Sequence, residues 1–241
     1  MTGAVRTALT PGSHVRLVRH AQASWGSADY DCLSPLGETQ ARHLGNWMTG
    51  DATDYVQVVR GSLRRHAQTL DLIAAQFASA GRKLPPARID PDWNEFDHVP
   101  VLRAYAAAHP DDADVAAARA GNSLALRGLL MAALRGWREG RFDDVAGETW
   151  PEFGARVAAA RERIDARNGA VLVVTSGGAI WRCAQAALGL DDQGLTDAKL
   201  TFLRNTSISE FDPGRERWRM LSWDEVPHLD APGNEHLHSH Y

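Results

Sequence analysis

The segment VLVVTSGGAI, residues 171–180, decides the fold of this chain. It opens with five apolar or β-branched residues in a row, which is typical of a strand buried on both faces. Ser176, Gly177 and Gly178 interrupt this pattern, and Ala179–Leu188 then has the spacing of a helix. A strand buried on both faces needs helices on both sides of its sheet. The segment therefore predicts the central strand of an α/β sandwich.

The segments on either side of this strand alternate between strand and helix patterns. Further strands are predicted at His14–Val18, Tyr55–Val59, Ser207–Phe211 and Trp218–Trp223. Helices are predicted to start at the Ser34-Pro35 pair, at about Ser62 and at Pro151. This order indicates a three-layer sandwich with a mostly parallel central sheet.

One region differs in kind from the rest of the chain. Residues 97–147 are rich in Ala, Leu and Arg, and Leu126, Leu129, Ala133 and Trp137 fall on one helical face. We expect a helical insertion at about 97–147 that covers the site of a single domain spanning residues 1–241. The tail after Pro227 is expected to be exposed.

Composition excludes several classes of protein. The formal net charge is −4, which provides no basic field for nucleic acid, and no apolar run approaches the roughly 18 residues of a membrane span. The two cysteines, Cys32 and Cys183, are expected to be free thiols in a reducing compartment. We expect a cytoplasmic protein with neither nucleic acid nor membrane as a partner, and leave open whether it forms a homodimer.

Three polar segments directly follow predicted strands, where the site of a parallel sheet is found. These are Arg19-His20, the helix start Gly61–Arg65, and Ser176–Gly178. Arg65 lies near a helix N-terminus, which favours an anion, and the glycines let backbone N–H groups approach a ligand. The pattern predicts a site for an anion.

With these motifs in place, the chain resembles the histidine phosphatase superfamily, which has the phosphoglycerate-mutase-like fold. The motifs are LVRHAQAS (17–24), LSPLGETQA (33–41), GSLRRHAQT (61–69), GETWPEFGARV (147–157) and VLVVTSGGAI (171–180). The resemblance implies a phosphoric monoester hydrolase that needs no metal or other cofactor. Such an enzyme acts on a small phosphorylated substrate through a phosphohistidine.

The resemblance also assigns roles to individual residues. His20 matches the nucleophilic histidine, and Arg19 and Arg65 match two phosphate-binding arginines. Glu95 lies where many members place the general acid. Asp97, two residues later, is the alternative.

The chain departs from the family pattern at one position. The family usually has a second, phosphate-binding histidine before a glycine, but here Ser176 precedes Gly177. A hydroxyl donates a hydrogen bond without carrying charge, so the resemblance leaves two alternatives. The chain is a slow or specialised phosphatase, or it is a weak or inactive relative that binds a phosphate ligand. A phosphoglycerate-mutase-type phosphotransferase is a further alternative.

Other residues are candidates for contacts beyond the phosphate. His98 is the histidine best placed to substitute for the missing one, because it follows Glu95 in the loop expected to roof the pocket. His66 is expected to point elsewhere, since it lies on a helix. Ser24 and Trp25 lie in the loop where family members contact substrate, and are candidates for substrate binding.

Overall fold

The computed structural model describes residues 12–24, 30–191, 203–214 and 217–240. The chain divides into two compact units, one formed by residues 1–95 with 157–241 and the other by Phe96–Arg156. The bounds of the second unit bracket the helical insertion predicted at 97–147. None of the helices in the described ranges is both long enough and apolar enough to span a membrane.

The first unit contains a six-stranded sheet with the strand order β3-β2-β4-β1-β5-β6. The strands are β1 (Val15–Arg19), β2 (Tyr55–Arg60), β3 (Ala87–Ile89), β4 (Ala170–Thr175), β5 (Ile208–Asp212) and β6 (Arg219–Glu225). β1 to β4 are parallel, and β5 and β6 form an antiparallel edge. β4 lies between β2 and β1, so the prediction of a central strand is confirmed. β3 was not predicted, because it has three residues and follows two prolines.

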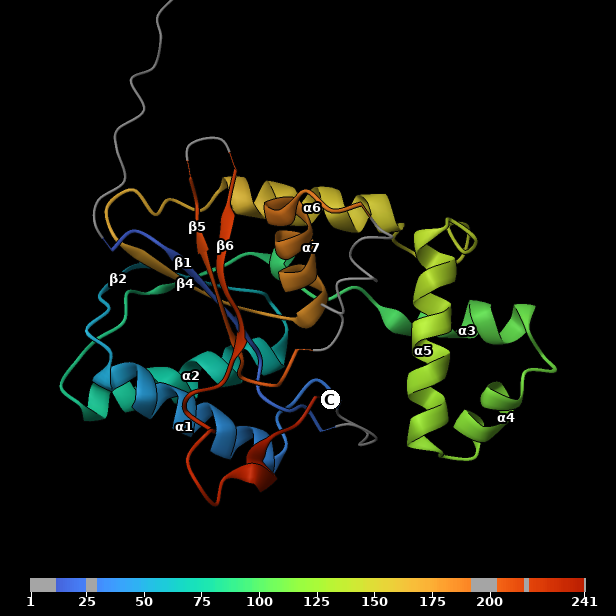
Figure 1. Cartoon of the computed structure of the whole chain (residues 1–241), viewed down its shortest axis with the longest axis horizontal. Helices are drawn as coiled ribbons and strands as arrows, with labels where there is room; N and C mark the ends of the chain where they lie inside the picture. The colour runs from blue at the N-terminus through green and yellow to red at the C-terminus, as the bar shows by residue number, and fades with distance from the viewer. Residues whose placement is uncertain (1–11, 25–29, 192–202, 215–216, 241) are drawn as a thin grey trace, which may run out of the picture. The chain divides into compact units, whose positions relative to one another are not determined.

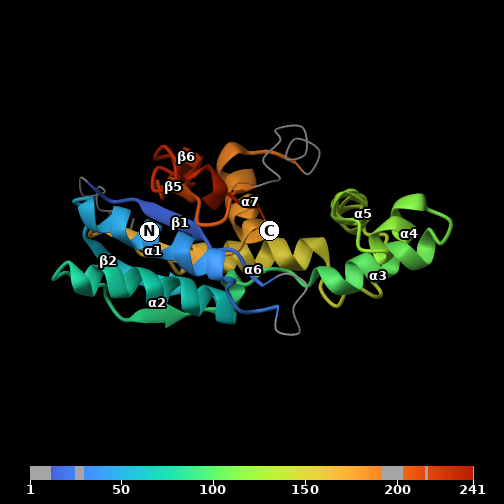
Figure 2. The same ribbon diagram turned by 90° about the horizontal axis from the view of Figure 1, so that it is seen from below.

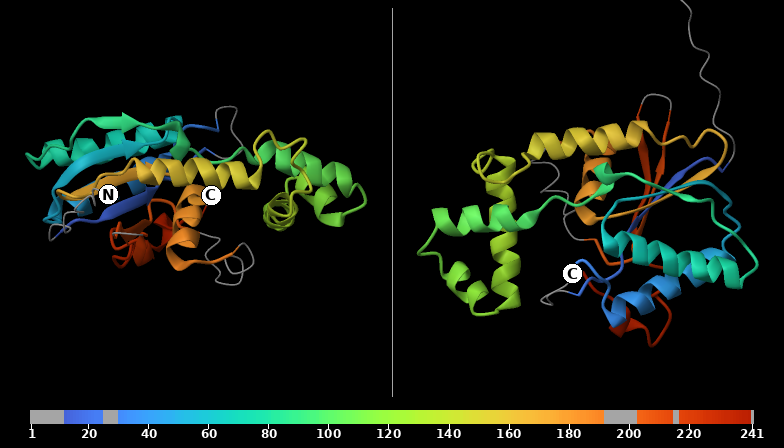
Figure 3. Two further views of the ribbon diagram at one scale, coloured as in Figure 1. Left: turned by 90° about the horizontal axis from the view of Figure 1, so that it is seen from above. Right: turned by 180° about the vertical axis from the view of Figure 1, so that it is seen from behind.

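Helices cover both faces of this sheet, as Figures 1 and 3 show. They are α1 (Pro35–Gly50), α2 (Arg64–Ser79), α6 (Trp150–Glu162, of which the part from Val157 belongs to this unit) and α7 (Gly177–Leu188). α1 and α2 pack together on one face, and α7 contacts β1 and β6 on the other. The α/β sandwich predicted from the sequence is therefore the observed fold.

Local sequence explains where α1 begins and which face it buries. Ser34 is its N-cap and accepts a hydrogen bond from the Gly37 N–H, with proline at the first helical position. Apolar residues of α1 and α2 then meet one face of the sheet. This buried cluster includes Leu44, Met48, Ile73, Phe77, Val58, Leu172 and Val174.

The second unit is helical and contains α3 (His98–Ala108), α4 (Ala113–Arg119) and α5 (Ser123–Arg138) (Figure 2). The predicted stripe on α5 is largely buried, with Leu129, Ala133 and Trp137 among its buried members. The Trp137 ring packs against Phe96, with ring centroids 4.8 Å apart. Much of the predicted region is helical, whereas an insertion that covers the site stays a prediction.

The tail of the chain is not exposed throughout, so the prediction for it was wrong. Leu229 and Leu237 are buried, the latter in a short 3₁₀ helix, Glu235–Leu237. Gln40 Nε2 donates to the Leu237 carbonyl at 2.6 Å, and the Asn205 N–H donates to the Ser239 carbonyl at 2.8 Å. Two leucines in a histidine-rich tail are too weak a signal for sequence reasoning to detect this packing.

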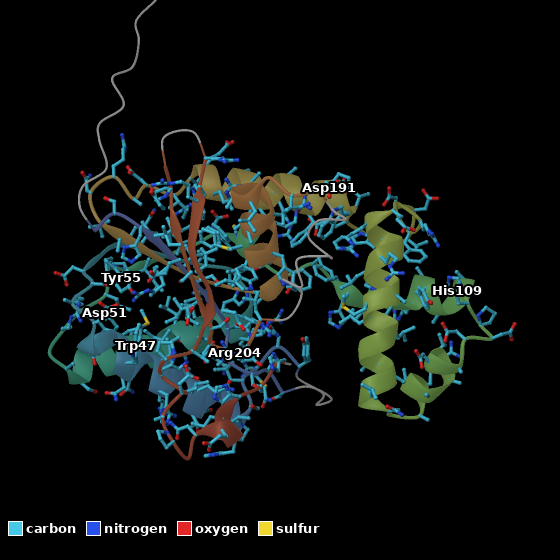
Figure 4. The ribbon with its side chains drawn as sticks, in the orientation of Figure 1. Trp47, Asp51, Tyr55, His109, Asp191 and Arg204 are labelled. Atoms are coloured by element: carbon cyan, nitrogen blue, oxygen red, sulfur yellow. The ribbon has the colours of Figure 1, made fainter. Side chains whose placement is uncertain are left out.

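Arg16 of β1 is a buried cation that joins three elements. Its guanidinium lies 2.8 Å from Asp51 and 2.7 Å from Glu210, donates to the Tyr55 hydroxyl, and faces the Trp47 ring. Figure 4 shows Trp47, Asp51 and Tyr55 on the same side of the first unit. Because a buried charge is tolerated only when it is paired, this network is a structural ion cluster.

Replacing Arg16 with methionine is expected to lower the free energy of unfolding by about 3 kcal/mol, because two carboxylates lose the cation between them. The matched control is Arg42→Met, which removes only an exposed i,i+4 pair with Glu38 and should cost less than about 0.5 kcal/mol. Urea denaturation of both variants beside the wild type gives the comparison. Equal losses would contradict a structural role for the Arg16 cluster.

Candidate active site

The strand order brings the predicted site segments together. β4 pairs with both β1 and β2, placing Arg19 opposite Thr175 and Arg60 opposite Val174 at the carboxyl edge. The His20 N–H donates to the Thr175 carbonyl at 2.8 Å, immediately before Ser176. The three loops that follow β1, β2 and β4 therefore meet at one edge of the sheet, as the sequence predicted.

His20 is held in a defined tautomer. It is 4% exposed, and its Nδ1 lies 2.7 Å from the Ala21 carbonyl oxygen. A carbonyl can only accept, so we assign the proton to Nδ1 and the lone pair to Nε2. Arg65 Nε donates to that nitrogen at 3.2 Å. Burial, and then the charges of Arg65 and Arg19, hold the pKa of His20 well below 6.5, so the imidazole is neutral.

The loop that carries His20 is fixed by side chains of α1 and α2. The Ala21 N–H donates to Thr69 Oγ1 at 3.1 Å, and the Gln22 N–H donates to Gln40 Oε1 at 3.0 Å. Gly37 allows α1 to approach closely, since a Cβ there would lie 2.1 Å from the Gln22 carbonyl oxygen. These contacts position the imidazole before any ligand binds.

Arg65 lies in the first turn of α2, where the residue is 6% exposed. Its Nη1 donates to Asp31 Oδ1 at 2.7 Å, while Asp31 Oδ2 accepts from the Arg64 N–H at 2.8 Å. The guanidinium carbon lies 5.4 Å from the centre of the Tyr30 ring. Asp31 and Tyr30 were not predicted, because their contacts with Arg65 join residues more than 30 positions apart.

Arg19 is the last residue of β1, and only part of its guanidinium is hydrogen-bonded within the described residues. Its Nη1 donates to the Leu203 carbonyl and, at 3.1 Å, to the His240 carbonyl. Its Nε is buried and has no hydrogen-bond partner among the described residues. Burial lowers the pKa of Arg19, and the nearby Glu95 opposes that shift. A buried N–H of a cation without an acceptor indicates a place for an anion.

Arg19 also lies beside the start of α7. A Cβ on Gly177 would lie 3.7 Å from Arg19 Nε, so the glycine leaves space between the guanidinium and the first turn of the helix. The N-terminus of α7, the positive end of its dipole, favours the same negative charge. The predicted role of Gly177 in phosphate binding stays a prediction.

Glu95 lies at the same helix N-terminus. Its Oε2 accepts from the Gly178 N–H at 3.0 Å, and its charge acts on Arg19. The alternative acid, Asp97, is the N-cap of α3 in the second unit, where Oδ1 accepts from the Val99 N–H at 3.0 Å. Both carboxylates accept from an N–H at a helix start, but only Glu95 lies in the first unit beside Arg19, so Glu95 is the acid used in the proposal below.

Ser176 and His66 form a buried pair, which corrects the expectation that His66 points elsewhere. Both side chains are fully buried, with Ser176 Oγ and His66 Nε2 2.7 Å apart. The His66 ring centre lies 5.5 Å from that of His20. Because α2 begins at the strand ends, the residue after Arg65 also faces them. Gly61 makes room, since a Cβ there would lie 2.2 Å from His66 Nδ1.

The remaining predicted contacts are not brought into this cluster by any described interaction. The Ser24 N–H donates to the Cys32 carbonyl at 2.8 Å, and Trp25 lies outside the described residues. His98 is the first residue of α3 and belongs to the second unit. Their roles in substrate binding stay predictions. In the described part of the chain, no three His, Cys, Asp or Glu side chains are grouped to hold a metal ion.

Acid is expected to destabilise the fold through its buried histidines. Burial lowers the pKa values of His20, His66 and His228, the last to about 3. In the unfolded chain each takes up a proton near pH 6.5, so stability present above that pH is lost as pH falls toward the folded pKa values. The slope approaches about 1.4 kcal/mol per pH unit for each histidine. Urea denaturation between pH 7.5 and 5 measures it.

The variant His228→Gln provides the control for this pH dependence. It removes one of the three buried imidazoles and should reduce the slope by about a third, whatever its effect on stability at pH 7.5. Carboxylates whose pKa values are lowered, such as Asp51 and Asp90, contribute only closer to pH 4. A flat profile from pH 7.5 to 5 would contradict neutral burial of the histidines.

The fold and the site together define a class: an α/β sandwich with a neutral histidine and two arginines at the carboxyl edge of its sheet. The family model described as histidine phosphatase superfamily (branch 1) matches residues 15–226. The chain therefore belongs to the histidine phosphatase superfamily. A search of curated proteins gives no match.

Several solved structures share the fold at low sequence identity. The phosphoserine phosphatase of Entamoeba histolytica in complex with 3-phosphoglyceric acid is 17% identical, with a TM-score of 0.60 over 90% of this chain and 98% of that one. The alpha-ribazole phosphatase of Shigella flexneri is 16% identical, with a TM-score of 0.59 over 88% and 96%. A mycobacterial glucosyl-3-phosphoglycerate phosphatase is 20% identical, with a TM-score of 0.57 over 89% and 100%.

Proposed function

We propose that this chain is a metal-independent phosphomonoester phosphatase that forms a phosphohistidine on His20. The observation that carries the proposal is the neutral His20 imidazole, whose Nε2 lone pair accepts from Arg65 Nε at 3.2 Å. Family membership supports phosphatase chemistry, and the three structural neighbours are named as phosphatases. Their names differ in the substrate, so the proposal extends only to small phosphorylated compounds.

The first half of the reaction transfers the phosphoryl group to the protein. Arg65 Nε turns from His20 Nε2 to a phosphoryl oxygen, and Arg19 Nε donates to another. His20 Nε2 attacks phosphorus in line with the leaving oxygen, so that a P–N bond forms as the ester P–O bond breaks. The Glu95 carboxyl group gives its proton to the departing alkoxide. The negative charge of the bound phosphate favours the protonated form of a carboxyl beside it.

The second half returns the protein to its starting state. Glu95, now a carboxylate, takes a proton from water as the water oxygen attacks phosphorus and the P–N bond breaks. Inorganic phosphate leaves, and the His20 lone pair is restored. Two guanidinium groups and a helix N-terminus supply the positive charge that phosphoryl transfer requires, which is why we propose a mechanism without metal.

Hydrolysis of para-nitrophenyl phosphate and a panel of phosphomonoesters, with and without EDTA, tests the proposal. We expect turnover that survives chelation and is absent from the variant His20→Ala purified in the same way. Rapid acid-free quenching should trap an acid-labile, base-stable phosphoprotein. Turnover that EDTA abolishes would contradict the metal-independent mechanism.

Two alternative functions predict different outcomes of the same assays. A phosphotransferase of the phosphoglycerate-mutase type would move the phosphoryl group between oxygens of one sugar acid faster than it releases phosphate. A relative that only binds a phosphate ligand would bind inorganic phosphate and turn over nothing on the panel. We also propose a cytoplasmic location, which the two free cysteines support.

A further inference from the structure

The position where the family usually has a second histidine carries a serine whose hydroxyl is in contact with a different histidine. Ser176 is the N-cap residue of α7, yet its side chain caps none of the N–H groups of that helix. Its Oγ lies 2.7 Å from His66 Nε2 instead. Both side chains are fully buried. An imidazole is thus present at this end of β4, supplied by α2.

The surroundings of His66 indicate which of its nitrogens carries the proton. Nδ1 is buried and has no hydrogen-bond partner among the described residues. A buried N–H without an acceptor costs more than a buried lone pair without a donor, so the proton is better placed on Nε2. His66 Nε2–H then donates to Ser176 Oγ. That leaves the Ser176 O–H free to donate to a different acceptor.

The neutral form of His66 follows from its neighbours. Burial, and then the charges of Arg65 and Arg60, hold the pKa of His66 well below 6.5. The centre of the His20 ring lies 5.5 Å from that of His66. A protonated His66 would add a further positive charge beside Arg65 and Arg60, which is unfavourable. A neutral donor that polarises a hydroxyl strengthens the next hydrogen bond in the chain without adding that charge.

We propose that His66 is a positioning residue that acts through Ser176, holding the serine hydroxyl so that its proton points to a phosphoryl oxygen at His20. Together the two residues take the place of the family's second histidine. His66 supplies the imidazole from α2, and Ser176 makes the contact to phosphate. This inference rests on the proposed function of the same site. It also implies that the serine is part of a working site and not a sign of lost activity.

A double-mutant cycle tests whether the two residues act as one unit. Ser176→Ala and His66→Leu should each lower kcat/KM for para-nitrophenyl phosphate by roughly 10- to 100-fold, since each removes the oriented donor to a charged group. The double variant should lose no more than the larger single effect. Additive losses would overturn the proposal, because they would mean that the two residues act separately.

Two further variants separate positioning from packing. His66→Gln keeps an N–H that can reach Ser176, so it should retain activity within about fivefold of the wild type, as should the exposed control His109→Gln. The double variant Ser176→His with His66→Ala moves the imidazole to position 176, where the family usually has its second histidine. It should recover most of the kcat/KM that the single variants Ser176→Ala and His66→Leu lose. Ser176→His alone should be impaired, because His66 occupies the adjacent space. Failure of both rescues would contradict the proposal.

The experiment also distinguishes failure of this inference from failure of the proposed function. Urea denaturation first confirms that each variant folds, and Ser176→Ala is the variant least expected to disturb packing. If the wild type turns over substrate and Ser176→Ala is as active, the inference fails while the function stands. If the wild type turns over nothing, titration calorimetry with inorganic phosphate replaces kcat/KM in the same cycle. Unchanged phosphate affinity in Ser176→Ala would then overturn the inference.

Discussion

The variant His20→Ala is expected to lose at least about 10⁴-fold in kcat, because it removes the atom to which the phosphoryl group is transferred. Without Nε2, water would have to attack the ester directly, and nothing else in the described site offers a neutral nitrogen lone pair to phosphorus. The His66 lone pair is on Nδ1 in the tautomer assigned above and lies against Gly61. Hydrolysis of para-nitrophenyl phosphate measured over hours would detect the residual rate.

The same substitution should leave phosphate binding largely intact, because Arg19 and Arg65 remain. We expect the dissociation constant for inorganic phosphate to change by less than about tenfold. The matched control is His14→Ala. His14 lies just before the first residue of β1, far along the strand from His20, and its ring hydrogen-bonds to the Gly12 carbonyl. This variant should change kcat by less than twofold. His20→Ala with activity near the wild type would refute the phosphohistidine mechanism.

Sequence reasoning could bring the residues of the candidate site together because their meeting follows from topology. Parallel strands end at one edge, so residues placed after β1, β2 and β4 had to be neighbours once those strands were recognised. The continuous apolar run of β4 and the Ser34-Pro35 start of α1 are local signals, and both were read correctly. The same rule selected Arg19-His20 and Gly61–Arg65, which the structure places at that edge, while the roles of these residues came from the family resemblance and stay predictions.

The residues that were missed depend on contacts between distant segments. Asp31 pairs with Arg65, and Ser239 and His240 return from the tail to Gln40 and Arg19. No periodicity encodes such contacts. His66 was misjudged for a different reason. Its direction depends on the rotation of α2 about its own axis, which the packing of that helix on the sheet determines and its own sequence does not.

The variant Arg65→Lys is expected to lose about 10³-fold in kcat/KM, although it keeps the charge. The guanidinium bonds two groups at once, with Nη1 on Asp31 Oδ1 at 2.7 Å and Nε on His20 Nε2 at 3.2 Å. In the proposed reaction Nε turns to the phosphoryl oxygen while Asp31 keeps the group in place. A lysine ammonium has one nitrogen, so it can stay with Asp31 or reach the phosphoryl group, but lacks the fixed geometry that does both.

The neighbouring substitution Arg64→Lys is the matched control for this prediction. Arg64 is exposed, and its backbone N–H, which donates to Asp31 Oδ2 at 2.8 Å, is unchanged by the substitution. Its kcat/KM should stay within twofold of the wild type. If Arg65→Lys lost no more than Arg64→Lys, charge alone would account for phosphate binding. The ordered arrangement of Asp31, Arg65 and His20 would then have no catalytic role, and the proposed in-line transfer would lose its main source of transition-state stabilisation.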